Sequence, residues 1–242
     1  MKKTICFDFG NTRLKYAVFE NDVFIEEAVL PDDHTNTIES LLKKFNPQKT
    51  ILSSVINHNV EIERILAERS TFHKLSHLSK LNFTTPVGKP ETIGTDRLAL
   101  AAAAVHYYPQ KNNLVIALGS CITYNFINQY QQFLGGAISP GMDMRFKSMN
   151  DHTALLPLVE PEWNFPVVAY DTKTNLQAGA IAGVTYEIAG FLDFYTNRYD
   201  NFNAVLTGGD STYFARHLKT KIFADANFLF KGLYALNEIN NS

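Results

Sequence analysis

Residues 4–15 have the sequence TICFDFGNTRLK, an apolar run that leads directly into Gly10 and a pair of small polar residues. This pattern predicts a strand, a tight turn and a second strand that continues to residue 20. Glycine allows a ligand to approach the backbone closely, and the N–H groups of such a turn can cradle phosphate oxygens. Asp8 precedes the turn, where a carboxylate can hold Mg²⁺ through water. Taken alone, the stretch is more typical of an ordinary hairpin closed by its Asn-Thr pair.

The composition is that of an ordinary globular protein. Of the 242 residues, 45% are hydrophobic and 19% are charged, and the formal net charge is −2. A chain of this length can form one large or two small domains. It has no Lys/Arg-rich run, so binding to nucleic acid or to a membrane surface is not expected. Cys6 and Cys121 are far apart in apolar surroundings, which predicts buried, reduced thiols rather than a disulfide or a metal site.

The apolar segments do not suit export or membrane insertion. Asp8 interrupts the apolar run that follows Lys2 and Lys3, which does not fit a signal peptide. The longest apolar run, at 98–105, is too short to span a bilayer. We therefore expect a cytoplasmic protein.

The order of elements in the first half recurs in the second half. A third strand is predicted at 23–30, and the apolar stretch 114–127 with its Gly-Ser turn, followed by 133–139, repeats the three-strand order. The other predicted strands lie at 51–55, 72–75 and 204–210, and the predicted helices at 35–45, 60–67, 98–108, 142–149, 173–199, 213–218 and 228–237. The sequence thus predicts a duplicated α/β architecture with a cleft between its halves, 1–111 and 112–242.

Seven short motifs occur along the chain in an order that resembles the type III pantothenate kinases of the acetate-and-sugar-kinase/Hsp70/actin superfamily. Each motif is weak alone, but together they span nearly the whole chain. They are Asp8-x-Gly10-Asn11-Thr12, Gly94-x-Asp96-Arg97, Gly119-Ser120-x-x-Thr123, Gly135-Gly136-x-Ile138-x-Pro140-Gly141, Thr153-Ala154-x-Leu156-Pro157, Asp171-Thr172 and Leu206-Thr207-Gly208-Gly209.

The resemblance implies a fold, a reaction and partners. The fold would be two tandem RNase-H-like domains of the actin-like ATPase type, assembled as a homodimer with the site at or near the dimer interface. The reaction would transfer the γ-phosphoryl group of ATP to the terminal hydroxyl of pantothenate, giving 4'-phosphopantothenate in the first step of coenzyme A synthesis. Its cofactors would be Mg²⁺ and a monovalent cation, K⁺ or NH₄⁺.

The resemblance also implies roles for the residues that match family motifs. For ATP these residues are Asp8, which organises Mg²⁺, with Gly10, Asn11, Thr12, Lys15 and Ser120. For pantothenate they are Val87, Gly94, Thr95, Asp96, Arg97 and Thr172, with Asp96 as the general base. The chemistry fits, because an attacking hydroxyl needs a proton acceptor within hydrogen-bond reach and the phosphoryl group needs positioning and positive charge. The chain has no Gly-x-x-x-x-Gly-Lys-Ser/Thr loop, which argues against a P-loop kinase.

Simpler interpretations exist for some of these residues. Asp96 suits the first turn of the following helix as a cap or through the helix dipole. Arg97 suits a surface ion pair, and Lys15 an exposed position on a strand. The family pattern favours the functional interpretation for Asp96 and Arg97.

Three positions depart from the family pattern. Ala117 stands where the family has an aspartate that binds the monovalent cation, and alanine offers no oxygen, so that ion site is in doubt. Asn125 stands where acidic residues are common, and Val87 replaces a tyrosine of the substrate loop. Two other functions therefore stay open: a kinase-like protein that binds nucleotide or pantothenate in a regulatory role, and a kinase of another small hydroxylated metabolite.

Overall fold

A computed structural model describes residues 2–86, 88–219 and 222–241. The chain forms two compact units, of which one comprises 1–110, 127–134 and 227–242 and the other 111–126 and 135–226. Each unit is built around one five-stranded sheet within the described residues. The fold is therefore α/β with two sheet domains, as the sequence predicted.

The first sheet grows from the strand-turn-strand at the start of the chain. Its strands are β1 (Lys3–Phe9), β2 (Leu14–Glu20), β3 (Val23–Leu30), β4 (Lys49–Ser54) and β5 (Thr71–Lys74). They lie in the order β3-β2-β1-β4-β5. β1 is antiparallel to β2 and parallel to β4, so the residues that end β1 and β4 meet at one edge of the sheet.

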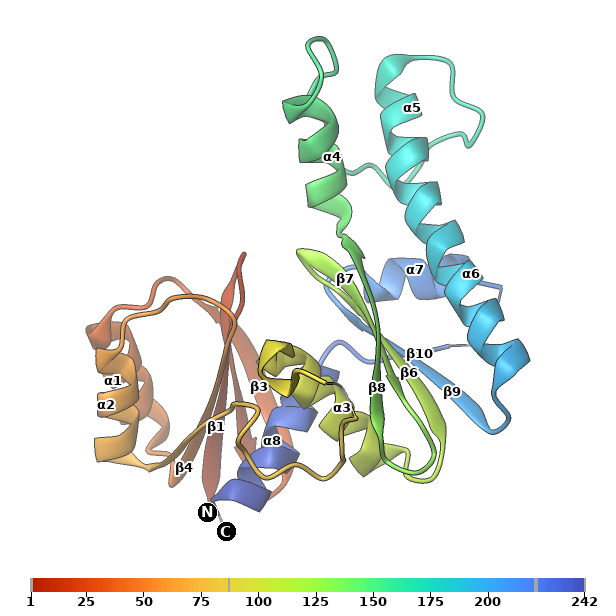
Figure 1. Ribbon diagram of the computed structural model, residues 1–242. Coiled ribbons are helices and arrows are strands. Elements are labelled where there is room, and N and C mark those ends of the chain that lie inside the picture. Colours follow the sequence, from red (N-terminus) through yellow and green to blue (C-terminus); the bar gives the residue numbers. More distant parts are fainter. Residues whose placement is uncertain (1, 87, 220–221, 242) are drawn as a thin grey trace. The chain divides into compact units, whose positions relative to one another are not determined.

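Helices cover both faces of this sheet (Figure 1). On one face, Ile5, Phe7 and Phe9 of β1 join a core with α1 (Thr35–Phe45) and α2 (Glu61–Arg69). Alternate residues of a strand point to opposite faces, so Cys6 and Asp8 belong to the other face. There α8 (Phe228–Asn240) packs on β1 and β4, and α3 (Thr95–Tyr107) packs on α8.

α3 and α8 approach each other so closely that their backbones touch. A Cβ atom at Gly232 would lie 1.9 Å from the carbonyl oxygen of Ala99, so only glycine fits at this point of α8. The alanine-rich stretch 99–104 of α3 is buried, and its small side chains permit the approach. This packing holds α3, the helix that begins with Thr95 and Asp96, beside the first sheet.

The second sheet has the same topology as the first. Its strands are β6 (Asn112–Leu118), β7 (Cys121–Ile127), β8 (Phe133–Pro140), β9 (Phe202–Gly208) and β10 (Phe223–Ala224). Their order, β10-β9-β6-β7-β8, is the order of the first sheet read from the other edge, and β6 is parallel to β9 as β1 is to β4. The duplication predicted from element order is confirmed at the level of strand topology.

Four helices accompany this second sheet among the described residues: α4 (Met142–Asp151), α5 (Thr172–Gln177), α6 (Gly183–Arg198) and α7 (Ser211–His217). The single helix predicted at 173–199 is helical throughout, but a π-helical turn at Ala178–Ala182 joins α5 to α6.

Some predictions from sequence differ from the structure. A short helix at Pro90–Thr92 and strand β10 were not predicted, because both are too short to show a hydrophobic period. Cys121 is only partly buried, whereas Cys6 is buried, and both are free thiols. Helix α8, which follows the proposed boundary at 111/112, packs on the first sheet. Among the helices described, none is long and apolar enough to cross a membrane.

Candidate active site

The turn between β1 and β2 has the predicted form. The Gly10 N–H donates to the carbonyl oxygen of Arg13 at 3.1 Å and closes the turn. Asn11 and Thr12 lie at its tip and are exposed. The geometry suits contact with a ligand outside the sheet.

Asp8 lies at the base of this turn, on the face of the sheet that carries α3 and α8. In the strand register it is paired with Lys15 of β2 and with Ser53 of β4. Burial, and next the nearby carboxylate of Asp96, raise the pKa of Asp8 from 3.8 to about 7, although Lys15 acts to lower it. Ionised Asp8 is therefore unfavourable in this site, and a bound cation would stabilise it.

The N-terminus of α3 is tied directly to the end of β4. Gly94 is the N-cap residue, and the Thr95 hydroxyl lies 2.9 Å from Ser53 Oγ and donates to the carbonyl oxygen of Ser54 at 3.3 Å. Since Ser53 is the register partner of Asp8, this link brings α3 next to β1. Asp96 and Asp8 thereby become neighbours although they are far apart in sequence.

The carboxylate of Asp96 folds back over Gly94. A Cβ atom at position 94 would lie 2.4 Å from Asp96 Oδ1, so any other residue there would push the carboxylate away. Burial raises the pKa of Asp96, while backbone N–H groups and Arg97 act to lower it. Asp96 lies within the first turn of α3 and does not cap it, since Gly94 holds the N-cap position.

Arg97 lies over an aromatic ring and is not a freely solvated surface residue. Its guanidinium carbon is 5.4 Å from the ring centre of Phe133. Burial lowers the pKa of Arg97, although Asp96 opposes that shift. The cation is therefore held in a fixed place by a ring face and a neighbouring carboxylate.

Lys15 is engaged within the sheet. Its Nζ atom forms an ion pair with Glu27 Oε1 of β3 at 2.7 Å. The side chain is only partly exposed, which differs from the exposed strand lysine that was one interpretation of the sequence. Contact with a phosphate requires this lysine to share its charge with Glu27.

The residues around Asp8 fit a divalent ion bound mainly through water and phosphate. Two adjacent carboxylates with raised pKa values gain from a cation, and Mg²⁺ typically uses one or two protein carboxylates together with substrate phosphates. Within the described residues, no group of three or more His, Cys, Asp or Glu side chains forms a closed metal cage. An open site of this kind suits an ion that arrives with its nucleotide.

The second turn is held by the start of α4. The Gly119 N–H donates to the carbonyl oxygen of Cys121 at 3.1 Å, and the Gly141 N–H donates to the Ser120 carbonyl oxygen at 3.1 Å. A Cβ atom at Gly141 would lie 2.2 Å from the Gly119 carbonyl oxygen, so only glycine permits this contact. Ser120 is partly buried at the tip of the turn.

Ala117 belongs to β6, whose neighbouring strands β9 and β7 both carry polar side chains. Its register partner on β9 is Thr207. On β7, the Asn125 amide nitrogen donates to the carbonyl oxygen of Val115 at 3.1 Å and to Thr123 Oγ1 at 3.0 Å, and it lies 3.4 Å from the Thr123 carbonyl oxygen. An amide nitrogen thus satisfies oxygens that an aspartate at position 125 would leave facing a negative charge.

Two of the residues predicted to contact pantothenate remain to be placed. Thr172 is exposed at the first position of α5, next to Asp171, whose side chain caps the helix by accepting from the Thr174 N–H at 2.9 Å. Val87 lies outside the described residues.

Sequence reasoning missed a polar cluster around Glu187 of α6. Glu187 accepts hydrogen bonds from Tyr124 of β7 at 2.8 Å and from Ser139 of β8, and it forms an ion pair with Arg145 of α4. Arg145 also donates from Nε to the carbonyl oxygen of Pro140 at 2.9 Å, beside Gly141 and the second turn. Glu187 occupies an unremarked position in a helix, so only the fold reveals the cluster.

The Glu187→Gln variant should be destabilised by about 2 kcal/mol at neutral pH, because Gln leaves the partly buried Arg145 without its anion. Burial acts to raise the pKa of Glu187, but the three donors outweigh it and lower the pKa overall. The carboxylate therefore stabilises the fold above its ordinary pKa, and this contribution is lost as the pH falls through its lowered value. Urea unfolding at pH 7, 5 and 3 should show the gap between wild type and variant closing.

Glu162→Gln is the matched control for this prediction, because Glu162 forms an exposed ion pair with Lys173 and exposed pairs contribute little. A gap for Glu187→Gln that stays constant from pH 7 to pH 3 would show that the charge of Glu187 is not what stabilises the cluster.

Solved structures with this fold define the class of protein. The chain is similar to the Campylobacter jejuni protein described as a Baf family transcriptional activator, with a TM-score of 0.62, 20% identity and 98% coverage of each chain. It is also similar to a protein from Sinorhizobium meliloti described as a 2-dehydro-3-deoxygalactonokinase, with a TM-score of 0.58, 11% identity and 98% coverage of each chain. At these identities the likeness establishes the fold alone, so the class is that of α/β proteins with two sheet domains.

The sequence comparisons identify the family within that class. The profile of the type III pantothenate kinases matches residues 4–193. A relative named as a type III pantothenate kinase, from Christiangramia forsetii, is 40% identical over 240 residues, covering 98% of this chain and 99% of the relative. The chain belongs to the type III pantothenate kinase family.

Proposed function

We propose that this chain transfers the γ-phosphoryl group of ATP to the terminal hydroxyl of pantothenate, the reaction that opens coenzyme A synthesis. The observation that carries the proposal is the pair Asp8 and Asp96, joined by the Ser53–Thr95 hydrogen bond in a chain whose relatives are named as type III pantothenate kinases. One carboxylate lies at a turn suited to phosphate, and the other at a helix start with a fixed arginine beside it.

The proposed roles follow from the chemistry of each side chain. Asp96 accepts the proton of the attacking hydroxyl, and its raised pKa makes it a stronger base than an ordinary aspartate. Arg97 supplies positive charge to the transferring group. Gly94 and Thr95 complete the pantothenate site and hold Asp96 in place. Thr172 is the further pantothenate contact proposed from the family pattern.

The remaining roles concern ATP. The Gly10–Thr12 turn offers backbone N–H groups, an amide and a hydroxyl to the phosphates. Lys15 of β2 and Ser120 of the second turn are the other proposed phosphate contacts. Asp8 would hold Mg²⁺ through water. When bound with ATP, Mg²⁺ neutralises the phosphate oxygens. The cytoplasm is the proposed site of action, because the reaction uses ATP and both cysteines are free thiols.

The proposal is tested by incubating the purified chain with Mg-ATP and pantothenate and identifying 4'-phosphopantothenate by mass spectrometry. A panel of other small hydroxylated metabolites serves as the control for specificity. Phosphorylation of another member of the panel in preference to pantothenate, or no phosphorylation at all, would overturn the proposal.

We propose further that turnover does not depend on a monovalent cation. Ala117 provides no oxygen ligand, and the Asn125 amide donates to the carbonyl oxygen of Val115 and to Thr123 Oγ1. Turnover should therefore agree within about twofold in potassium, ammonium and sodium chloride, since these ions then differ only in screening. The melting temperature should likewise be the same in the three salts.

A large loss of turnover when potassium is replaced by sodium would contradict this expectation. The Ala117→Asp variant separates the remaining alternative, a regulatory kinase-like protein. If the native chain were inactive in every salt and Ala117→Asp restored turnover in potassium, the regulatory interpretation would replace the catalytic one.

A homodimer is the proposed assembly. The segment from α4 to α6 exposes large apolar side chains, including Leu155 at 92%, Val168 at 90% and Tyr170 at 87% exposure. Exposed apolar side chains in such number are typical of a surface that another protein covers. Sedimentation analysis should give a dimer for the native chain and a monomer for Val168→Asp; a native monomer at micromolar concentration would exclude the assembly.

The duplicated halves are proposed to be 1–111 and 112–242, each an RNase-H-like domain. The matching strand orders of the two sheets support this division. In this proposal, α8 is the part of the second domain that packs on the sheet of the first.

A further inference from the structure

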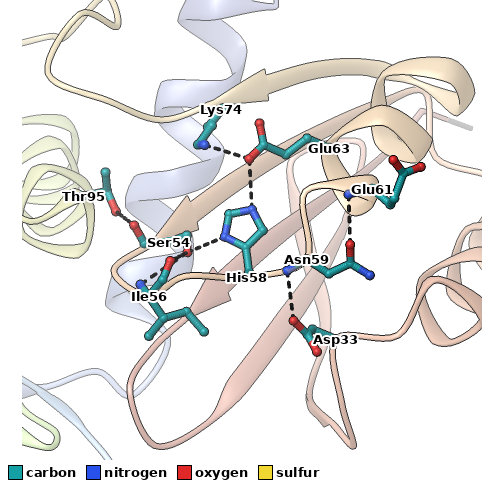
Figure 2. A network of polar contacts seen from close by, with 9 residues as sticks. All are labelled: Asp33, Ser54, Ile56, His58, Asn59, Glu61, Glu63, Lys74 and Thr95. Atoms are coloured by element: carbon teal, nitrogen blue, oxygen red, sulfur yellow. Dashed lines mark hydrogen bonds and ion pairs between the residues drawn. The ribbon is translucent and has the colours of Figure 1, made fainter.

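A buried histidine, His58, lies in the connection between β4 and α2. Its described contacts include neither Asp8 nor Asp96. Its side chain is 5% exposed. Nδ1 lies 2.9 Å from Ser54 Oγ, and Nε2 lies 3.0 Å from Glu63 Oε1 of α2, which also accepts from Lys74 at 2.7 Å. Figure 2 shows His58 between Ser54 on one side and Glu63 on the other.

The histidine is fixed by packing as well as by hydrogen bonds. Its ring stands edge-on to Phe9 of β1, with 5.5 Å between the ring centres. The next residue, Asn59, is anchored because its N–H donates to Asp33 Oδ2 at 3.0 Å and its side chain accepts from the Glu61 N–H at 3.1 Å. The ring therefore has one orientation, set by β1, α2 and the connection before α2.

The Ser54 hydroxyl is held by two neighbours. Ser54 Oγ lies 2.9 Å from His58 Nδ1 and 3.1 Å from the carbonyl oxygen of Ile56. What His58 fixes is the backbone around Ser54, because the side chain of Ser54 is held both to the ring and to the turn that follows it.

The backbone of Ser54 is also the anchor of α3. Its carbonyl oxygen accepts from the Thr95 hydroxyl at 3.3 Å. Thr95 Oγ1 also lies 2.9 Å from Ser53 Oγ, a contact in which either hydroxyl can donate. Figure 2 shows Thr95 and His58 on opposite sides of Ser54. The row His58–Ser54–Thr95 thus crosses the end of β4 from the α2 face to the α3 face.

We propose that His58 is a positioning residue for the phosphoryl transfer, acting through Ser54 and Thr95 to hold the Asp96 carboxylate in place. The inference rests on the proposed function of Asp96. Thr95 directly precedes Asp96, and a base must be held within a fraction of an ångström of its working position for full activity. His58 reaches no substrate in this arrangement.

A double-mutant cycle tests the row. His58→Ala and Thr95→Val should each lower kcat roughly tenfold through misplacement of the base. The KM for ATP should change less, because the Gly10–Thr12 turn is closed by its own hydrogen bond. If both residues act through one row, the double variant should lose about as much as either single variant and not about a hundredfold.

His73→Ala is the matched control. His73 Nε2 lies 2.8 Å from Ser79 Oγ, so it is also a histidine bound to a serine in the same unit, but none of its described contacts leads to α3. It should leave kcat nearly unchanged, and any small loss should multiply with that of Thr95→Val. Added imidazole should partly restore His58→Ala, because the ring leaves a cavity of its own shape, and should not affect Thr95→Val.

Hydrogen exchange gives a readout that does not depend on turnover. Amides at 95–97 should exchange faster in His58→Ala than in wild type. In His73→Ala their exchange rates should equal those of wild type. If His58→Ala folds poorly, Ser54→Ala breaks the same contact with a smaller change and should show the same pattern. The inference would be overturned if His58→Ala left both hydrogen exchange and kcat unchanged, or if the losses in the double-mutant cycle multiplied. An inactive wild type would instead overturn the proposed function, and the hydrogen-exchange test would still apply.

Discussion

The Asp96→Asn variant should lose pantothenate phosphorylation by about 10²–10⁴-fold in kcat, the usual contribution of a positioned general base. Asparagine has nearly the shape of aspartate, so the cap at Gly94 and the start of α3 stay as they are. It cannot accept the hydroxyl proton. Initial rates with saturating Mg-ATP measure the loss, and calorimetric titration should show that ATP still binds.

Two further variants sharpen this result. Glu91→Gln removes an exposed carboxylate from the same segment and should leave kcat unchanged. Gly94→Ala keeps the carboxylate but displaces it, because the added Cβ would lie 2.4 Å from Asp96 Oδ1, so kcat should fall while the fold is retained. An Asp96→Asn enzyme with a kcat close to that of wild type would mean that another group takes the proton.

Asp8→Asn should abolish turnover and at the same time stabilise the chain in the absence of Mg-ATP. The pKa of Asp8 is raised from 3.8 to about 7, chiefly by burial and then by Asp96. The folded chain therefore favours the protonated form of Asp8, and wild type loses stability as this carboxyl group ionises with the pH rising through about 7. A rise of this size corresponds to at most about 4 kcal/mol, and water at a partly exposed carboxylate reduces it to about 2 kcal/mol.

The pH dependence follows from the same shift. Below pH 4, Asp8 is protonated in both the folded and the unfolded chain, so variant and wild type should be equally stable. The variant's advantage should grow between pH 4 and pH 7 and stay constant above pH 7. Thermal unfolding at pH 4, 6 and 8 measures it, and Asp193→Asn, which removes an exposed carboxylate on α6, is the control.

Adding Mg-ATP distinguishes a role of Asp8 in holding Mg²⁺ from a purely destabilising effect of its buried charge. Mg-ATP should raise the melting temperature of wild type more than that of Asp8→Asn, because only the carboxylate can hold the ion. Equal ligand stabilisation of the two proteins would argue against Asp8 as the Mg²⁺ residue. A variant less stable than wild type at pH 8 would show that Lys15 already compensates the charge of Asp8.

The local elements could be derived from the sequence because hydrophobic period and turn chemistry are properties of short stretches. The run before Gly10 predicts β1, and the alanine-rich run 98–108 predicts α3, which in the structure starts at Thr95 because Gly94 takes the N-cap position. The duplication was visible in element order, and the two strand orders confirm it. Helix α8 showed the limit of this reasoning, since no local pattern indicates which sheet a helix packs on.

The sequence by itself determined the family, the two sheets and the chemical types of the candidate residues. Only the tertiary structure decided which of these residues meet. Asp8 and Asp96 become neighbours through the Ser53–Thr95 hydrogen bond and the register of β1 with β4. Lys15 is paired with Glu27, and Asn125 of β7 donates to the carbonyl oxygen of Val115 on β6. The physical reason is that charge, desolvation and hydrogen bonding act between neighbours in space, and the packing of distant segments creates those neighbours.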